Sequence, residues 1–284
     1  MSANGSLSAF ASAYSTGPAT PASSPAAEPT EPTESPAQPS EEPTSGTVSG
    51  VYYLIDTRTG FRLVRELRDL AGDDPVAAAV EAMVAAPEDP DYSTMWNPGI
   101  EVLGTDVAPG SPRDVVSVDL SAEARTANAG SEVAERMVQQ LVYTVTEALG
   151  DESAAVRLLV EGEPAGELWG SVVWDEPVSR ADPLDVRSLV QIDTPREGAT
   201  VSSPVRVEGD AAVFEATLPW RVLDQSGAEV TSGTATTAEG QTFAAYSFSV
   251  ELEPGSYTVE ITEDDPSGGE GGALMVDTRT ITVE

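Results

Sequence analysis

The stretch from Gly130 to Gly150, GSEVAERMVQQLVYTVTEALG, is the longest segment of the chain with a helical period. Its apolar residues recur at steps of three and four, which places them on one stripe of a helix that a sheet must cover. Ser131 offers a side-chain oxygen as N-cap, and Gly150 permits a left-handed stop. The stripe consists of Ala134, Met137, Val138, Leu141, Val145 and Ala148. The sequence therefore predicts a helix from Ser131 that packs on a sheet.

Strand-like segments lie on both sides of this helix. RDVVSVDLS (113–121) precedes it, and AAVRLLVEG (154–162) follows it. Further upstream, VYYLID and FRLVREL alternate around a turn that ends at Gly60, which predicts a hairpin. Asp74 and Pro75 open a second helix as N-cap and first-turn proline. With IEVLGTDV as a further strand, the order indicates an α+β domain with a mixed sheet and two helices.

The C-terminal part of the chain changes to a period of two, which is typical of half-buried strands. Turn signals separate the alternating runs at Ser226-Gly227, Pro254-Gly255 and Gly268 to Gly272. About seven short strands in roughly a hundred residues predict an all-β immunoglobulin-like sandwich. The inward positions are Val190, Ile192, Val205, Val207, Phe214, Ala216, Leu218, Tyr246, Phe248, Val250, Leu252, Tyr257, Val259, Ile261, Ile281 and Val283.

Composition divides the chain into four parts. Residues 1–46 are rich in Ser, Thr, Ala, Pro and Glu, with a proline every three or four positions from Pro18, so they predict a disordered tether. We expect the α+β domain over 47–175, a linker over 176–187 and the sandwich over 188–284. A tether of this kind suits a stalk that holds a folded body away from a membrane. The alternative is a disordered tail with no anchoring role.

The charge of the chain is strongly one-sided: 48 acidic residues face 14 basic residues, which gives a net charge of -34. Such a surface repels phosphate backbones, so nucleic acid is excluded as a partner. Every basic residue is Arg, and His, Cys and Lys are absent. Their absence excludes cysteine nucleophiles, histidine bases, Schiff-base lysines and thiolate or imidazole zinc sites. We expect no enzyme activity, cofactor or metal, and the all-arginine set favours an actinobacterial source with a GC-rich genome.

Four pieces of this part of the chain resemble the GerMN domain of bacterial sporulation and spore-germination proteins. They are the run VSVDLS, the helix start GSE, the QLVYTVTE turn within the helix and the LLVEG strand. The resemblance covers about 51–174, and its most specific pieces are 118–121 and 130–146. It implies a domain similar to the ring-building modules of envelope-spanning machines, with a scaffolding or binding role and no known catalytic residues. Such domains also occur in envelope lipoproteins of bacteria that make no spores. This chain has no lipobox cysteine, so a lipid anchor is an inference about an N-terminus absent from it.

The stretch PREGATVSSPVRVEGDAAVFEATL is similar to the immunoglobulin-like domain that accompanies GerMN in germination-related proteins. The two domains stand in the expected order, and the similarity extends to the final TRTITVE. It implies an extracytoplasmic interaction module without a catalytic constellation. The residues that carry it are Ser203, Pro204, Val205, Gly209, Val213, Phe214, Glu215, Ala216 and Leu218.

Two aromatic residues on one loop are the candidate site. Tyr92 and Trp96, together with Trp169 and Trp174 near the linker, offer a platform for a glycan or a partner protein. The alternative is that these rings cap a core or seal a domain junction.

Carboxylates are the remaining acid and base groups, and a hydrolase needs two of them across a cleft. The candidate groups are Asp73 with Asp74, Glu88 with Asp89 and Asp91, Glu161 with Glu163, and Glu263 with Asp264 and Asp265. They fall on predicted loops or strand ends, where water solvates them, and Glu215 is expected to face solvent from a strand. Glu263, Asp264, Asp265 and Glu270 could surround a calcium ion, although a mobile hairpin loop explains the same residues.

These observations predict a non-enzymatic, extracytoplasmic envelope protein, either a membrane-anchored lipoprotein or secreted. Its expected partners are other envelope proteins and, as the alternative, cell-wall glycan, and self-association stays open. A wall-active hydrolase that uses carboxylates and a calcium-dependent adhesin are the rival hypotheses. The family name mentions sporulation, but the resemblance does not transfer that process to this chain.

Overall fold

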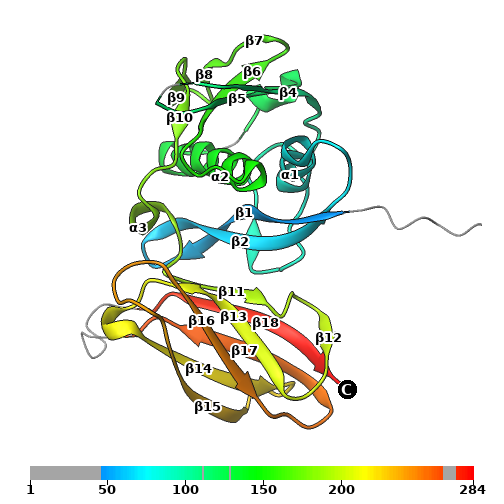
Figure 1. Ribbon diagram of the computed structural model, residues 1–284, viewed down its shortest axis with the longest axis vertical. Helices are drawn as coiled ribbons and strands as arrows, with labels where there is room; N and C mark the ends of the chain where they lie inside the picture. The colour runs from blue at the N-terminus through cyan, green and yellow to red at the C-terminus, as the bar shows by residue number, and fades with distance from the viewer. Residues whose placement is uncertain (1–45, 111, 128, 265–272) are drawn as a thin grey trace, which may run out of the picture. The chain divides into compact units, whose positions relative to one another are not determined.

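The α+β domain has three layers, with two helices between two separate sheets (Figure 1). The computed structural model describes residues 46–110, 112–127, 129–264 and 273–284. The predicted tether therefore lies outside the described residues, except for its last residue. The elements of this domain are β1 (Thr47–Thr57), β2 (Gly60–Leu70), α1 (Pro75–Val84), β3 (Tyr92–Ser93), β4 (Val102–Ala108), β5 (Val115–Leu120), η1 (Ala122–Arg125), α2 (Ser131–Leu149), β6 (Ala155–Val160), β7 (Glu163–Pro164), β8 (Gly166–Leu168) and β9 (Val172–Trp174).

Helix α2 forms where the apolar period predicts it, but both of its sides are covered. Most of the predicted stripe lies in one cluster with α1, β5, β6 and alternate residues of β1, while Tyr143 on the opposite side packs with Tyr52 and Leu54 of β1. Polar residues on that side bond to the β1 backbone: Thr144 Oγ1 accepts from Tyr52 N at 3.0 Å, and Gln140 Nε2 donates to Tyr52 O at 3.0 Å. Residues 140–146 are therefore all buried.

The ends of the two helices follow their local chemistry with one correction. Asp74 caps α1 by accepting from Val76 N and Ala77 N, both at 3.0 Å. Gly150 ends α2 at φ 74°, in the left-handed region that the sequence predicts. The N-cap of α2 is Gly130, and no side chain caps it, because Ser131 is already the first helical residue. The predicted capping role of Ser131 is wrong.

The predicted mixed sheet is present, and the hairpin forms a sheet separate from it, while β8 and β9 make a small two-stranded sheet. The hairpin β1-β2 pairs antiparallel from Thr47↔Leu70 to Thr57↔Gly60 and takes up the short strand β3. The second sheet has the order β10-β6-β5-β4, with β5 and β6 parallel and the outer strands antiparallel. The parallel pair is joined by α2, which is the strand-helix-strand unit that the sequence predicts.

The segment over the predicted linker is ordered. It contains β10 (Val178–Ser179), which pairs with β6, and the single-turn helix α3 (Pro183–Val186), which Asp182 caps. Arg180 in this segment donates to Thr146 Oγ1 at 2.7 Å and pairs with Glu147 at 3.0 Å, both on α2. These bonds hold the connection against the α+β domain, although its sequence has little period.

The C-terminal domain is an immunoglobulin-like β-sandwich of two sheets. The sheet orders are β11-β13-β16 and β12-β18-β17-β14-β15. Their inward residues form a separate apolar cluster with almost all of the predicted positions. The strands are β11 (Val190–Thr194), β12 (Ala199–Val201), β13 (Val205–Ala211), β14 (Thr217–Asp224), β15 (Glu229–Thr236), β16 (Ala244–Val250), β17 (Gly255–Thr262) and β18 (Val276–Val283).

Two details of the sandwich differ from the sequence pattern. The run from Phe214 to Ala216 is a 3₁₀ turn, η2, in which Glu215 and Ala216 have φ of 53° and 58°. Phe214 is exposed there, so this part of the predicted strand is wrong, and β14 begins only at Thr217. The short strand β12 and the edge strand β15 were not predicted, because neither has a run of alternating apolar residues.

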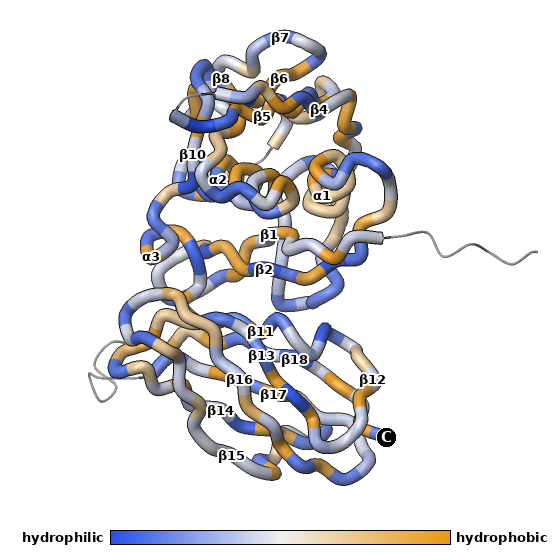
Figure 2. Tube along the Cα trace, viewed as in Figure 1, coloured by the Kyte–Doolittle hydropathy of each residue, from blue (hydrophilic) through white to orange (hydrophobic). Residues whose placement is uncertain are grey.

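Hydrophobic residues gather in separate cores for the two domains (Figure 2). The core of the α+β domain lies between the layers, and the tube in Figure 2 has apolar stretches in β1 and α1 and both apolar and polar stretches in α2. Among the described residues, no helix has the length and apolar character needed to cross a membrane.

Candidate functional site: an ion-paired junction between the domains

Charged side chains from the two domains meet at two clusters. The first, the Arg279 cluster, consists of Arg279 and Asp277 of β18, Asp89 from the loop between α1 and β3, and Tyr92, the first residue of β3. Every second residue of β18 is buried, and Asp277 and Arg279 lie on the same buried face of the strand as Ile281 and Val283. The buried face of β18 therefore extends from the sandwich core to the junction with the α+β domain. At the junction its buried residues are charged instead of apolar.

The bonds of the Arg279 cluster are short and mutual. Arg279 Nη1 donates to Asp89 Oδ2 at 2.7 Å and to Asp277 Oδ1 at 3.1 Å, and its Nη2 donates to the Tyr92 hydroxyl at 2.7 Å. That hydroxyl donates to Asp277 Oδ1 at 2.7 Å. Asp277 Oδ2 accepts from Ile192 N of β11 at 2.6 Å. The four side chains are only 1 to 5% exposed, so the cluster is closed to solvent.

Two carboxylates share one guanidinium in this cluster, which leaves an excess of buried negative charge. Burial raises the pKa of Asp89 to about 7, although Arg279 lowers it in part. Burial also raises the pKa of Asp277 and of the Tyr92 hydroxyl. A buried charge without full compensation is costly, so the proton is held more tightly in the folded protein.

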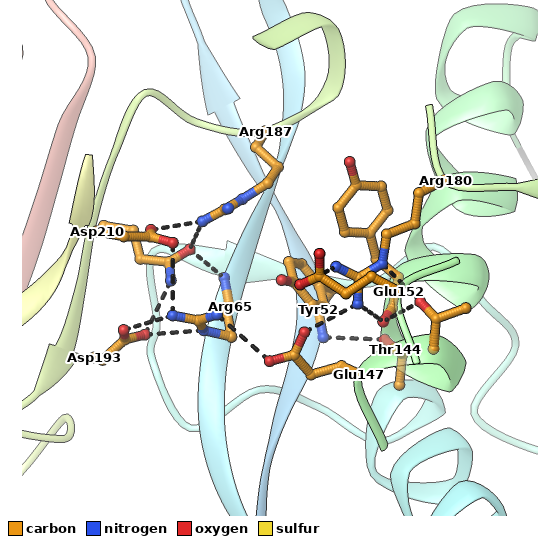
Figure 3. A network of polar contacts seen from close by, with 12 residues as sticks. Tyr52, Arg65, Thr144, Glu147, Glu152, Arg180, Arg187, Asp193 and Asp210 are labelled. Atoms are coloured by element: carbon orange, nitrogen blue, oxygen red, sulfur yellow. Dashed lines mark hydrogen bonds and ion pairs between the residues drawn. The ribbon is translucent and has the colours of Figure 1, made fainter. Parts of the chain in front are cut away.

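The second cluster, the Arg65 cluster, joins β2 to the sandwich (Figure 3). Arg65 forms a two-bond pair with Asp193, at 3.1 Å from Nε and 2.6 Å from Nη2, and lies 3.5 Å from Glu147 of α2. Its backbone N–H donates to Gln191 Oε1 at 3.0 Å. Arg187 pairs with Asp210 at 2.6 Å. Three segments, β2, α2 and the start of the sandwich, are therefore held by one guanidinium.

Further contacts cross the junction at its rim. Arg196 of the sandwich pairs with Asp69 of β2 at 2.5 Å, and Arg58 of the hairpin turn pairs with Glu263. Thr278 Oγ1 donates to Asp91 Oδ2 at 2.6 Å. Rim pairs of this kind contribute little to stability by themselves, but they fix the register of the contact.

A cleft with a volume of about 510 Å³ opens beside the Arg65 cluster. Arg180 stacks on the Tyr143 ring at 4.6 Å, and Arg187 stacks on Phe243 at 4.0 Å. Both guanidiniums already pair with carboxylates, Arg180 with Glu147 and Glu152 and Arg187 with Asp210. The arrangement thus joins α2, the connecting segment and the sandwich.

The structure places the two predicted site residues inside the protein. Tyr92 is 5% exposed and belongs to the Arg279 cluster, and Trp96 is 3% exposed and packs edge-to-face on Trp169 at 5.2 Å. Trp174 is also buried and donates from Nε1 to Val156 O at 3.3 Å. Tyr92 thus lies within the junction, and Trp96 and Trp174 belong to the core of the α+β domain. The position of Tyr92 on a polar loop could not reveal that its hydroxyl bonds to Asp277 and Arg279 of the sandwich.

The acidic groups singled out from the sequence mostly have structural partners. Asp74 caps α1, Asp89 pairs with Arg279, and Asp264 accepts from Phe214 N at 2.9 Å. Glu263 accepts from Met275 N at 2.7 Å besides its pair with Arg58. The predicted calcium ligands Asp265 and Glu270 lie outside the described residues. Within the described ranges, no group of three or more acidic side chains is arranged to hold a metal.

The residues that build the junction, chiefly Arg65, Asp277 and Arg279, were not singled out from the sequence. One signal for them exists in the run VDTRTITV. Asp277 and Arg279 alternate in step with Ile281 and Val283 and so lie on the same face of the strand. A strand whose inner face is otherwise apolar thus has charged residues at its first inner positions. Such a pattern indicates a second buried surface beyond the sandwich core.

Two family models match the chain. The model described as "Sporulation and spore germination" matches residues 50–166. The model described as "Immunoglobulin-like domain of bacterial spore germination" matches residues 189–270. These matches confirm the two resemblances drawn from the sequence motifs, whereas the lipid anchor stays a prediction. None of the curated proteins compared with the chain matches it.

Solved structures with similar regions include the tandem GerMN domains of the sporulation protein GerM from Bacillus subtilis. That structure is 20% identical, with a TM-score of 0.39, and the alignment covers 51% of this chain and 50% of that chain. CopC from Methylosinus trichosporium OB3b is 25% identical, with a TM-score of 0.26, over 34% of this chain and 91% of that chain. The chain thus spans about half the length of the GerM structure.

Proposed function

Because the chain joins a domain of the sporulation and spore germination family to the immunoglobulin-like domain of bacterial spore germination, we propose that it is a non-enzymatic scaffold of the bacterial envelope. Its two domains act as one rigid body on the extracytoplasmic side of the membrane. They hold docking surfaces for other envelope proteins at a fixed distance and angle. An N-terminal lipid anchor or secretion brings this body to its place.

The Arg279 cluster is the observation that carries this proposal. A flexible linker would let the domains move independently, since interfaces between domains in one chain are usually small and polar. Here a buried guanidinium bonds to both domains, and the Arg65 cluster adds a second fixed point. Two separated fixed points remove rotation about either one. A rigid arrangement of this kind is needed by a scaffold and not by two independent binding modules.

Affinity capture with the full chain as bait tests the proposal. The bait is incubated with solubilised envelope and with cytosol from the source bacterium, and captured proteins are quantified by mass spectrometry. We expect specific envelope proteins to be enriched and to be lost with Arg279→Gln, which loosens the junction. Arg206→Gln is the matched control, because Arg206 pairs with Glu208 on the exposed surface of the sandwich, away from the junction.

Two results would count against the proposal. One is capture of cytosolic proteins alone. The other is release of soluble fragments from purified peptidoglycan by the full chain, with the release lost in Asp89→Asn or Glu215→Gln. The second result would establish the rival hypothesis, a wall-active hydrolase that uses carboxylates.

A further inference from the structure

Strand β15 is an edge strand with one side unpaired. It lies at the end of the sheet β12-β18-β17-β14-β15 and pairs antiparallel with β14 from Thr217↔Thr236 to Leu223↔Glu229. Within the described residues, no other strand pairs with its second side. Natural sheets protect such edges with charges, prolines, bulges or very short strands, since an open edge can accept another strand.

Most of the edge of β15 has no charge and no proline, and its one irregularity is a bulge at Val230, where the pairing steps from Val222↔Thr231 to Leu223↔Glu229. The nine residues from Val230 to Ala238 contain no charge and no proline, in a chain with a net charge of -34. Ser232, Thr234 and Thr236 are exposed on its outer face. The edge strand β4 also has a bulge, after Val102, but it differs from β15 in having an acidic residue, Asp106, in its centre.

A groove of about 550 Å³ runs beside this edge. Its walls come from β15, β14 and β17, with Ser232 and Thr234 on one side and Pro219, Arg221 and Thr262 on the other. Within it, Arg221 is already paired with Glu260 at 2.6 Å, and Glu229 adds a negative charge whose Oε1 accepts from Ser232 Oγ at 2.7 Å. The groove thus has room for side chains and an excess of negative charge at one end.

Gly233 brings the groove close to an aromatic ring. A Cβ atom at this position would lie 2.6 Å from Trp220 Cζ2, so only glycine fits over the indole. The indole stacks on Phe248 at 4.6 Å, and its buried Nε1 has no hydrogen-bond partner among the described residues. Trp220, on the neighbouring strand β14, therefore lies in contact with the edge strand β15 at Gly233.

We propose that β15 is a docking edge for an extended segment of a partner protein, which adds to the sheet as a further strand. Strand addition obtains its affinity from backbone hydrogen bonds and its specificity from pockets for alternate side chains. The uncharged centre of β15 calls for a partner segment with uncharged residues in its middle. Glu229 and Glu239 at the two ends of the charge-free run select Lys or Arg at the ends of that segment. This inference rests on the proposed docking function and names the surface that performs it.

A synthetic peptide of about ten residues tests the edge. It has threonine and valine alternating in its centre and lysines at both ends, and the full chain is labelled with ¹⁵N. We expect the largest amide shifts in β15 and at the Trp220 indole. A peptide of the same sequence with alternate central amides N-methylated cannot form the backbone bonds and should not bind. Equal binding of both peptides, shifts confined to other strands, or no shift at millimolar peptide would overturn the proposal.

Charge variants locate the site within the sandwich. Ser232→Lys with Thr234→Lys places two like charges beside the peptide and should weaken binding about tenfold or more. Thr280→Lys with Thr282→Lys is the matched control, because these exposed threonines lie on β18, which is paired on both sides. Ser247→Lys with Ser249→Lys tests β16, the uncharged edge of the other sheet. Loss of binding in either of these two variants alone would overturn the assignment to β15.

The same variants separate this inference from the proposed function. If the β15 variant and the wild-type chain capture the same envelope proteins, the docking function stands and the assignment of the edge fails. If the wild-type chain captures no envelope protein, the proposed function itself fails.

Discussion

At the scale of single residues, the junction depends on one guanidinium and one hydroxyl that bond to each other and to the same carboxylate. Arg279 and Tyr92 both donate to Asp277 Oδ1, at 3.1 and 2.7 Å. Neither bond reaches solvent, so no water replaces a partner that is removed. The cost of a substitution here is therefore the desolvation of the groups left behind.

Tyr92→Phe keeps the ring and removes only the hydroxyl. It leaves the Asp277 carboxylate and the Arg279 guanidinium each one bond short, which should lower the free energy of unfolding by about 1–3 kcal/mol. Chemical denaturation followed by tryptophan fluorescence measures the change. The control is Tyr257→Phe, whose exposed hydroxyl donates to Glu253 O and whose removal should have little effect. Equal stability of Tyr92→Phe and the wild-type chain would show that the hydroxyl contributes nothing.

The site could be predicted from the sequence only in part at this scale. The loop with Tyr92 and Trp96 was recognised as special, and sealing of a junction was one of the two interpretations. The partners of Tyr92 lie on β18, about 185 residues further along the chain. No local pattern encodes that contact, so the burial of the ring could not be derived. The charged inner positions of β18 were the remaining signal.

At the scale of elements, α2 shows how far a hydrophobic period can be trusted. The stripe predicted the helix and one covered side, because burial of apolar residues every three or four positions is what the period records. The second side is covered through polar bonds from Gln140 and Thr144 to Tyr52, and these leave no trace in the period. The sequence pattern also does not predict edge strand β15. Ala235 is the one buried residue of that strand, so the strand has no run of alternating apolar positions.

Thr144→Val tests the polar side of α2. The substitution conserves shape and leaves Tyr52 N–H buried without its acceptor, so we expect a loss of about 1–3 kcal/mol in the free energy of unfolding. Thr126→Val removes an exposed hydroxyl that bonds to the Glu123 carbonyl within its own turn, and it serves as the control. Thermal unfolding followed by circular dichroism distinguishes the two. Similar melting temperatures for both variants would contradict a structural role of Thr144.

At the scale of the whole molecule, the excess of acidic residues destabilises the folded state. A net charge of -34 produces repulsion across both domains, and the buried carboxylates at the junction add to it. Acidification and salt should relieve these effects by different routes. Protonation removes charge at particular groups, whereas salt screens exposed charges over about 8 Å at physiological ionic strength.

Lowering the pH from 8 to 5 should stabilise the protein. The pKa of Asp89 is about 7 in the folded state against 3.8 when unfolded, so the folded state binds its proton more tightly. The stability gained from this proton is complete below the unfolded pKa and is lost as the pH rises through 7. The melting temperature should rise by several degrees on acidification, and Asp89→Asn should flatten the rise. A melting temperature that falls over this range would contradict the assignment.

Below about pH 4 the trend should reverse. Hydrogen bonds from Ser153 and Ser226 lower the pKa of Asp151 and Asp224. Partial burial acts to raise the pKa of Asp74, but the bonds from Thr105 and from the N–H groups of α1 together outweigh it and lower that pKa. These groups stabilise the folded state above their unfolded pKa, and this contribution is lost as the pH falls. Scanning calorimetry from pH 3 to 8 should therefore show a maximum. A monotonic rise to pH 3 would show that the capping carboxylates are irrelevant.

Salt should raise the melting temperature at pH 8, since it weakens the repulsion among exposed acids more than it weakens the buried pairs. The expected change between low salt and about 0.5 M NaCl is an increase of a few degrees. At pH 5 the increase should be smaller, because fewer groups carry charge. Destabilisation by salt at pH 8 would mean that the exposed ion pairs of the rim outweigh the general repulsion.

A distance measurement between two spin labels tests the fixed junction most directly. The chain has no cysteine, so Val173→Cys in the α+β domain and Val230→Cys in the sandwich, at 68% and 50% exposed, give two unique labels. Pulsed electron paramagnetic resonance should show a single narrow distance distribution, which broadens when Arg279→Gln is added. A broad distribution in the chain with Arg279 intact would contradict the claim that the two domains form one rigid body.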